Sequence, residues 1–286
     1  MTAPGTDLAK RVAAWPKRSW TFWIGLILVG INVIAALLTL VWTPYDPSST
    51  VGGRLEAPSW VHLVGTDRLG RDLFTQIMIG SRIALMVGAG AVAIGAAIGV
   101  TLGVLAAFAT KWLDDALAAA LDILIAFPTL LLAMLVVAAS DTATLWSAIL
   151  ALGLALSAIV GRLTRILAKR VLRMDYITAA RTSGTSWPMI VFIHVLPNIW
   201  PTLLVSFALQ FGLAAIAEAS LSYLGLGAPP PNASWGRLLQ EAQSTMYTAP
   251  FGAIAPGLAL LLLVIGINLT ADGLRDIVDP TRRGRR

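Results

Sequence analysis

Long apolar runs separated by shorter polar stretches dominate the pattern of this 286-residue chain. Six runs stand out: Trp20–Trp42, Ile83–Phe108, Leu113–Ala138, Leu145–Gly161, Ile199–Tyr223 and Phe251–Ala271. Because a helix of about 20 apolar residues crosses the hydrocarbon core of a bilayer, each run predicts one transmembrane helix. The pattern therefore predicts an all-α membrane protein with six spans.

The first run is the one most easily mistaken for a secretion signal. It is too long for the apolar core of a signal peptide, and no small-residue cleavage site precedes Pro44. The tryptophans at its two ends, Trp20 and Trp42, suit the two membrane interfaces. We therefore expect this run to be retained as the first span.

The composition supports a membrane protein. The chain is 57% hydrophobic and 13% charged, whereas soluble domains carry about 25% charged residues. It has no cysteine, which excludes disulfide frameworks, thiolate metal sites and cysteine nucleophiles. The basic residues that give the net charge of +6 lie beside the apolar runs. Their placement indicates membrane topology and not a nucleic-acid partner.

The positions of the basic residues predict the orientation of the chain. With six spans, both ends lie on the same side of the membrane. That side has sixteen of the 21 lysines and arginines, and the other side has five: Arg54, Arg68, Arg71, Arg82 and Arg237. Because cytoplasmic segments are enriched in lysine and arginine, we expect both termini and the loop 162–198 to be cytoplasmic in a bacterial plasma membrane.

The loop between the fourth and fifth spans contains signals for two short helices. Asp175 can cap the first helix, which carries Ala179 and Ala180. Gly184 can then form a sharp turn, since glycine adopts a positive φ without steric cost. The small alanine side chains would let another protein surface approach closely.

The second short helix is expected to follow this turn directly. Ser186 can cap it, and Pro188 is tolerated in its first turn. Pro197 is expected to end this helix just before the fifth apolar run begins at Ile199. The loop is thus predicted to be a compact knuckle of two helices joined at a glycine.

This loop resembles the cytoplasmic coupling loop of ABC importer permeases. The resemblance rests on Thr178, Ala179, Ala180, Gly184, Leu196 and Pro197, in the order Ala-Ala, three residues, Gly, then Leu-Pro. In that family an acidic residue normally precedes the alanines, and Thr178 takes its place here. The alternative is an ordinary basic loop that touches lipid headgroups.

Two segments on the opposite side carry further motifs. In the first, Asp67 is expected to cap a helix that lies on the membrane surface, with Leu69, Leu73 and Ile77 on one face. In the second, Leu221–Leu239, a Leu-Gly-Leu-Gly is followed by prolines and by Ser-Trp-Gly. Both resemble the permeases of the dipeptide/oligopeptide/nickel branch, in particular their C-type subunit.

This second resemblance implies that the outer segments face a substrate-binding protein. The residues carried over are Gly65, Thr66, Asp67, Gly70, Arg71 and Asp72 in the first segment and Ser234, Trp235 and Gly236 in the second. Two alternatives are open: the segments are folded connectors only, or His62, Asp67 and Asp72 form a metal site.

Polar residues inside the apolar runs require partners, because charged groups are costly in lipid. Asp122 lies in the third run and Glu218 near the outer end of the fifth. Each either lines a substrate pathway or pairs with a neighbour, which for Glu218 includes the outer headgroups. In the second run a small residue recurs every fourth position from Ala91 to Gly103, which predicts close packing of another helix.

The expected organisation has five parts: an N-terminal tail (1–19), the first span (20–42), an outer segment with an amphipathic helix (43–82), a five-helix core (83–271) and a basic tail (272–286). The family resemblance implies a heterodimer with a second, homologous permease, two ABC ATPase subunits and an extracytoplasmic binding protein. The chain has no G-x-x-x-x-G-K-[ST] phosphate loop, so ATP and Mg are expected on the ATPase subunits and no cofactor in this chain.

Peptides are the preferred substrate, since the chain has no cluster of His, Cys and Met for a soft metal. A nickel or metal-chelate importer of the same branch is the alternative. An ion-coupled secondary transporter is the alternative of another class, and it would be expected to show internal repeats that this sequence lacks.

Overall fold

The computed structural model describes residues 20–139, 144–227 and 233–278, and every regular element in these ranges is helical. The long helices are α2 (Trp20–Leu38), α3 (Leu73–Phe108), α4 (Lys111–Ala126), α5 (Thr129–Ala138), α6 (Leu145–Leu172), α9 (Leu196–Tyr223) and α11 (Phe251–Val278). The short elements are α7 (Asp175–Thr182), α8 (Trp187–Ile190), the π-helical turn η1 (Val191–Val195), α10 (Trp235–Ala242) and the 3-10 turn η2 (Gln243–Thr245).

Five of these helical stretches are long and apolar enough to cross a membrane, and the number is six when α4 and α5 count as one broken span. The two helices of this pair meet at an angle of 90°. The break falls at Phe127 and Pro128, and the proline stands as the N-cap of α5. Because proline fixes φ and disfavours a helical conformation in the residue before it, the expected third span is bent at this point.

The helix expected on the membrane surface is not formed. Asp67 does not cap a helix; its carboxylate accepts hydrogen bonds from the backbone N–H groups of Leu69 and Arg71 in a tight turn. Gly70 follows with φ +74°, which no α-helix accommodates. Asp72 is the true N-cap, accepting from the N–H of Thr75 at 2.8 Å. The second span therefore starts ten residues before the expected Ile83.

Small residues bring α3 and α6 together, as the spacing in the second run predicts. A Cβ atom added at Gly99 would lie 2.6 Å from the carbonyl oxygen of Ser157, and one added at Gly103 would lie 2.5 Å from that of Gly161. Helices α2 and α11 also pack closely at glycines, since a Cβ atom added at Gly25 would lie 2.7 Å from the carbonyl oxygen of Gly266. The packing interpretation of the glycine stripe is thus confirmed.

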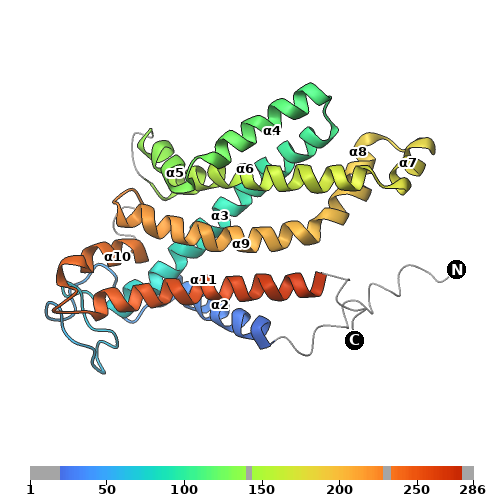
Figure 1. The fold of residues 1–286 in the computed structure, drawn as a ribbon. Coiled ribbons are helices and arrows are strands. Elements are labelled where there is room, and N and C mark those ends of the chain that lie inside the picture. The colour runs from blue at the N-terminus through green and yellow to red at the C-terminus, as the bar shows by residue number, and fades with distance from the viewer. Residues whose placement is uncertain (1–19, 140–143, 228–232, 279–286) are drawn as a thin grey trace.

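The two ends of the bundle carry different structures (Figure 1). The short helices α7 and α8 project from one end, where α2 begins and α11 ends. At the other end lie α10 and the long connection between α2 and α3. The loop 162–198 and the outer segments of the sequence analysis therefore lie at opposite ends of the molecule.

Candidate coupling site

The α7–α8 connection turns at Gly184, as the sequence predicts. Gly184 has φ +86°, and its N–H donates to the carbonyl of Arg181 at 3.0 Å. The next N–H, from Thr185, donates to the carbonyl of Ala180 at 3.0 Å. These two bonds are the Schellman pattern that ends a helix at a left-handed glycine. The start of α7 differs from the prediction, because Met174 is the N-cap and Asp175 is the first helical residue.

Buried aliphatic side chains fasten this knuckle to the bundle. Ile177 of α7 is 2% exposed, while Ile190 of α8 and Val195 of η1 are fully buried. They form one cluster with Ala168 of α6 and Leu203 of α9, and side chains near the end of α3 pack against it. Side chains of α7, α8 and η1 are therefore packed against side chains of α3, α6 and α9.

Aromatic contacts hold the two short helices to each other and to the bundle. The guanidinium of Arg181 lies 3.6 Å from the ring centroid of Trp187, which links α7 to α8 across the glycine turn. Phe108, the last residue of α3, makes an edge contact with Trp187 at 5.2 Å between centroids. Tyr176 contacts the ring of His194 at 5.9 Å, and the side-chain N–H of Asn198 donates to the Tyr176 hydroxyl at 3.2 Å.

The residues singled out in the loop lie mostly on its open surface. Thr178 and Ala179 are exposed, and Ala180 is half-buried. A Cβ atom at Gly184 would meet nothing within 4 Å. Large apolar side chains surround them: Met174, Tyr176, Trp187, Met189, Phe192 and Ile193 are each 41–70% exposed. Such a patch suits contact with another macromolecule.

Pro197 does not end the second short helix, so this part of the prediction is wrong. The chain continues from α8 through the π-helical turn Val191–Val195 into α9, in which Pro197 is the second residue. A proline has no N–H and its ring collides with the carbonyl four residues earlier, and a wider π turn accommodates both defects. Leu196 is half-buried against the aliphatic cluster, and Pro197 is exposed.

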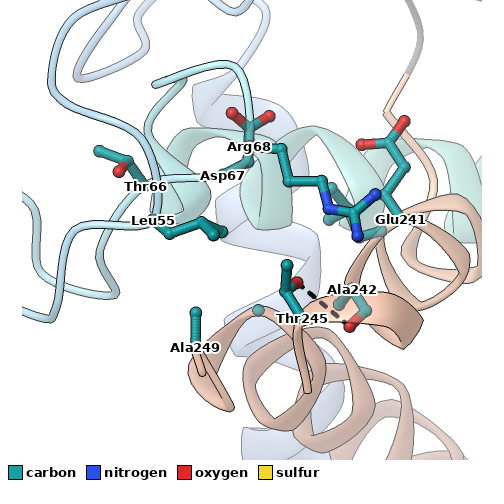
Figure 2. A pocket seen from close by; sticks show the side chains of 10 residues that line it. Leu55, Thr66, Asp67, Arg68, Glu241, Ala242, Thr245 and Ala249 are labelled. Atoms are coloured by element: carbon teal, nitrogen blue, oxygen red, sulfur yellow. Dashed lines mark hydrogen bonds between the residues drawn. The ribbon is translucent and has the colours of Figure 1, made fainter. Parts of the chain in front are cut away.

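At the other end, an ionic network ties the α2–α3 connection to α10. Arg71 donates to Asp67 at 2.6 Å and to Glu241 of α10 at 3.2 Å. Glu241 also accepts from Arg237 one turn earlier at 2.9 Å. A pocket lies beside this network, lined by residues 55 and 66–68 of the connection and by α10, η2 and the start of α11 (Figure 2).

Most outer residues expected to face a binding protein are buried within the chain itself. Thr66, Asp67, Asp72, Ser234 and Trp235 are 0–8% exposed. The glycines lie against backbone carbonyl oxygens of other residues. A Cβ atom added at Gly65 would lie 2.3 Å from such an oxygen, one added at Gly70 2.4 Å, and one added at Gly236 1.8 Å. These residues are internal framework, and any docking surface consists of their exposed neighbours.

Trp235 shows how this framework is built. Its indole N–H donates to the carbonyl of Ile77 in α3 at 3.0 Å, and a Cβ atom at Gly80 would lie 2.4 Å from the indole ring. Ser234 caps α10 by accepting from the N–H of Arg237. A glycine in α3 thus makes room for the tryptophan that fixes α10.

The interpretation of His62, Asp67 and Asp72 as a metal site is not supported. The His62 Nδ1 lies 3.0 Å from Asp72 Oδ1, but Asp67 is engaged with Arg71. Across the described ranges there is no group of three or more His, Cys, Asp or Glu side chains placed to hold a metal ion. The buried His62–Asp72 pair instead supports the start of α3.

The two acidic residues of the spans have different surroundings. Asp122 of α4 pairs with Arg162 of α6 at 3.1 Å, and both side chains are about half exposed. Glu218 is 2% exposed and accepts from the Ser222 hydroxyl at 2.7 Å. Glu218 therefore lies inside the protein, and the hypothesis that it pairs with outer headgroups is wrong.

Comparison with known proteins identifies the family. Residues 99–284 match the family described as binding-protein-dependent transport system inner membrane component. The chain belongs to this family of inner membrane transport components. A dipeptide transport system permease protein, DppC, from Alkalihalophilus pseudofirmus is 36% identical over 258 residues, which cover 90% of this chain and 84% of the relative. A glutathione transport system permease protein, GsiD, from Pectobacterium atrosepticum is 39% identical over 89% of this chain and 86% of the relative.

A solved structure supports the fold of this permease. The inward-facing MetNI methionine ABC transporter superposes with a TM-score of 0.58 over 72% of this chain and 96% of that one, at 19% identity. The likeness shows the helical fold of a type I importer permease. The predicted fold class is confirmed, and the chain is an inner membrane component.

Sequence analysis missed an ionic cluster in this permease. Asp114 of α4 accepts from Arg165 of α6 at 2.6 and 2.9 Å and also contacts Lys169. The signal was present, because Asp114 and Asp122 are eight residues apart while Arg162 and Lys169 are seven apart. Two antiparallel helices with these spacings bring both pairs together.

Gln210 was missed as well. It is 3% exposed in the middle of α9, and both polar atoms of its side chain lack a hydrogen-bond partner in the described part of the chain. It lies on the same face of α9 as the buried Glu218 and Ser222, so polar side chains interrupt an otherwise apolar interface.

Proposed function

We propose that this permease is the membrane-spanning subunit of an ATP-driven importer that takes up peptides delivered by a substrate-binding protein. The family supports transport with a binding protein, and two relatives are named for dipeptide and glutathione transport. Glutathione is itself a small peptide, so the two names agree on the substrate class.

The knuckle of α7, Gly184 and α8 is the observation that carries this proposal. It projects from the bundle, its alanines are open to a partner, and its buried residues Ile177 and Ile190 belong to the same cluster as α6 and α9. Two ATPase subunits, which bind ATP and Mg, dock at this end, and a movement between them displaces the helix ends. The end with α7 and both termini is cytoplasmic.

A second, homologous permease completes the pathway as the other half of a heterodimer. The substrate then passes between the two permeases while α3, α6 and α9 alternate between two packings. The transport subunit itself performs no catalysis. The binding protein docks at the α10 end, on the exposed neighbours of the Asp67–Arg71–Glu241 network.

The test is transport by the assembled complex in proteoliposomes. Uptake of a radiolabelled dipeptide is expected only with the binding protein, ATP and Mg, and a non-hydrolysable ATP analogue should abolish it. Single-cysteine variants fix the orientation, since the chain has no cysteine. Gln240→Cys, at an exposed position of α10, should react from outside spheroplasts, and Ser183→Cys only after lysis. Uptake driven by a proton gradient without ATP would contradict the proposal.

A further inference from the structure

An exposed apolar turn lies in the connection between α2 and α3. Trp60 is 97% exposed, Val61 66% and Leu63 56%. The ten residues from Ala57 to Thr66 carry no Asp, Glu, Lys or Arg, although residues 43–72 as a whole contain seven. Of the two polar side chains in the turn, His62 is 3% exposed and lies against Asp72, and the exposed Ser59 hydroxyl accepts a hydrogen bond within the turn. The large side chains exposed on the outside are apolar.

The turn is held in a defined shape. The N–H of Ser59 donates to the carbonyl of His62 at 2.8 Å, and the N–H of His62 donates back to the Ser59 hydroxyl at 3.0 Å. The Tyr45 ring contacts the His62 ring in a tilted arrangement, with 5.1 Å between centroids. The Tyr45 hydroxyl donates to the carbonyl of Val61 at 2.9 Å. Trp60 and Val61 are therefore presented outward by a supported turn.

This turn lies close in sequence to the exposed end of the first span. The end of the first span is exposed and apolar: Leu40 is 65% exposed, Val41 90% and Trp42 59%. Only two residues lie between Trp42 and Tyr45, whose hydroxyl bonds the turn, so at most about 11 Å of chain joins them. The headgroup region adds about 5–7 Å to each side of the hydrocarbon core. The turn thus continues the lipid-facing surface of α2 at the depth where tryptophan is favoured.

We propose that the turn Ser59–Leu63 is an interfacial anchor that inserts Trp60, Val61 and Leu63 into the headgroup region of the bilayer on the α10 side. It fixes the height of the α2–α3 connection, and with it the Asp72 cap of α3, against the membrane surface. The proposal requires α2 to span the membrane but does not depend on the transport activity.

The test uses fluorescent labels at single cysteines in vesicles of phosphatidylethanolamine and phosphatidylglycerol. Val61→Cys and Leu63→Cys carry an NBD label, and Gln240→Cys, on the exposed side of α10, is the matched control. A phospholipid spin-labelled at its headgroup should quench the labels at 61 and 63, and aqueous iodide should quench them several-fold less than the label at 240.

Two outcomes would overturn the proposal. The first is iodide quenching at 61 and 63 equal to that at 240, with no quenching by the spin-labelled lipid. The second is protection from iodide that appears only when the substrate-binding protein is added, because the turn would then belong to a protein-docking surface. Two labelled positions guard against a variant that fails to fold.

Discussion

The sequence motifs at the two ends of the bundle end up in opposite environments. At the α7 end, Thr178, Ala179 and Gly184 are exposed, and the backbone beneath them is anchored by buried aliphatic residues. At the α10 end, most of the motif residues are buried, with Asp67 bonded to Arg71 and Ser234 capping α10. The same kind of motif is a contact surface at one end and an internal framework at the other.

The difference concerns how each end can respond to a partner. The α7 end has a cation–π contact and aromatic edges across an open glycine turn, which leave its small residues free to be covered. The α10 end has ion pairs and backbone contacts too close to admit even one extra methyl group. We therefore expect substitutions at the α10 end to act on stability, and those on the surface of α7 to act on coupling.

The largest expected difference is between the stability losses caused by alanine at two glycine positions. In Gly236→Ala the new Cβ atom would lie 1.8 Å from the carbonyl oxygen of Ala219, so α10 must shift, at a cost of about 3 kcal/mol. In Gly184→Ala nothing lies within 4 Å, and only the positive φ costs about 1 kcal/mol. Thermal unfolding in detergent measures both. Equal destabilisation would contradict the comparison.

The next effect concerns the ionic cluster between α4 and α6, in which Asp114 pairs with Arg165 and Lys169. Asp114→Asn leaves Arg165 and Lys169 without their carboxylate and should cost about 2 kcal/mol, less than a fully buried pair because both cations are partly exposed. Asp122→Asn is the matched control on the same helix, and its exposed pair should contribute less than about 1 kcal/mol. A larger loss from Asp122→Asn would show that the half-exposed pair is the important one.

A smaller loss is expected from Arg71→Ala. It removes the link from Asp67 to Glu241 and should cost about 1–2 kcal/mol, with faster amide hydrogen exchange in α10. Arg68→Ala, next to the same pocket, keeps that link and serves as the control. Unchanged exchange in α10 after Arg71→Ala would mean that Trp235 alone holds this helix.

The smallest effect is predicted for Arg181→Ala. Loss of the contact with Trp187 should cost about 0.5–1 kcal/mol and act locally. Hydrogen exchange of α7 should rise while the global melting temperature stays unchanged. Arg173→Ala, an exposed residue just before α7, should alter neither measurement.

Much of the fold was predictable because its signals are local. The apolar runs predicted the spans, the four-residue spacing from Ala91 to Gly103 predicted close packing of another helix, and Gly184 predicted a positive φ. Each of these depends on residues close together in the sequence. The bend at Pro128 was less visible, since the apolar run continues across it.

The errors have two physical causes: a choice between competing local signals, and partners that are distant in sequence. Asp67 and Asp72 are both plausible helix caps, and Gly70 together with the bond from Arg71 selects the second. Arg71 meets Glu241 across 170 residues, so the burial of the outer motif was not evident from its own residues. The pairing of Asp114 with α6 depends on tertiary packing in the same way.

The most direct test of the account is a charge placed on the open surface of α7. Ala179→Arg puts a long cationic side chain on an exposed position, so the permease should insert and melt normally, and Ala179→Ser is the size-matched control. Co-purification of the ATPase subunits and ATP hydrolysis stimulated by loaded binding protein are measured in proteoliposomes. The account predicts that Ala179→Arg loses one or both and Ala179→Ser retains them. Full ATPase binding and full stimulation in Ala179→Arg would show that this knuckle is not the coupling element.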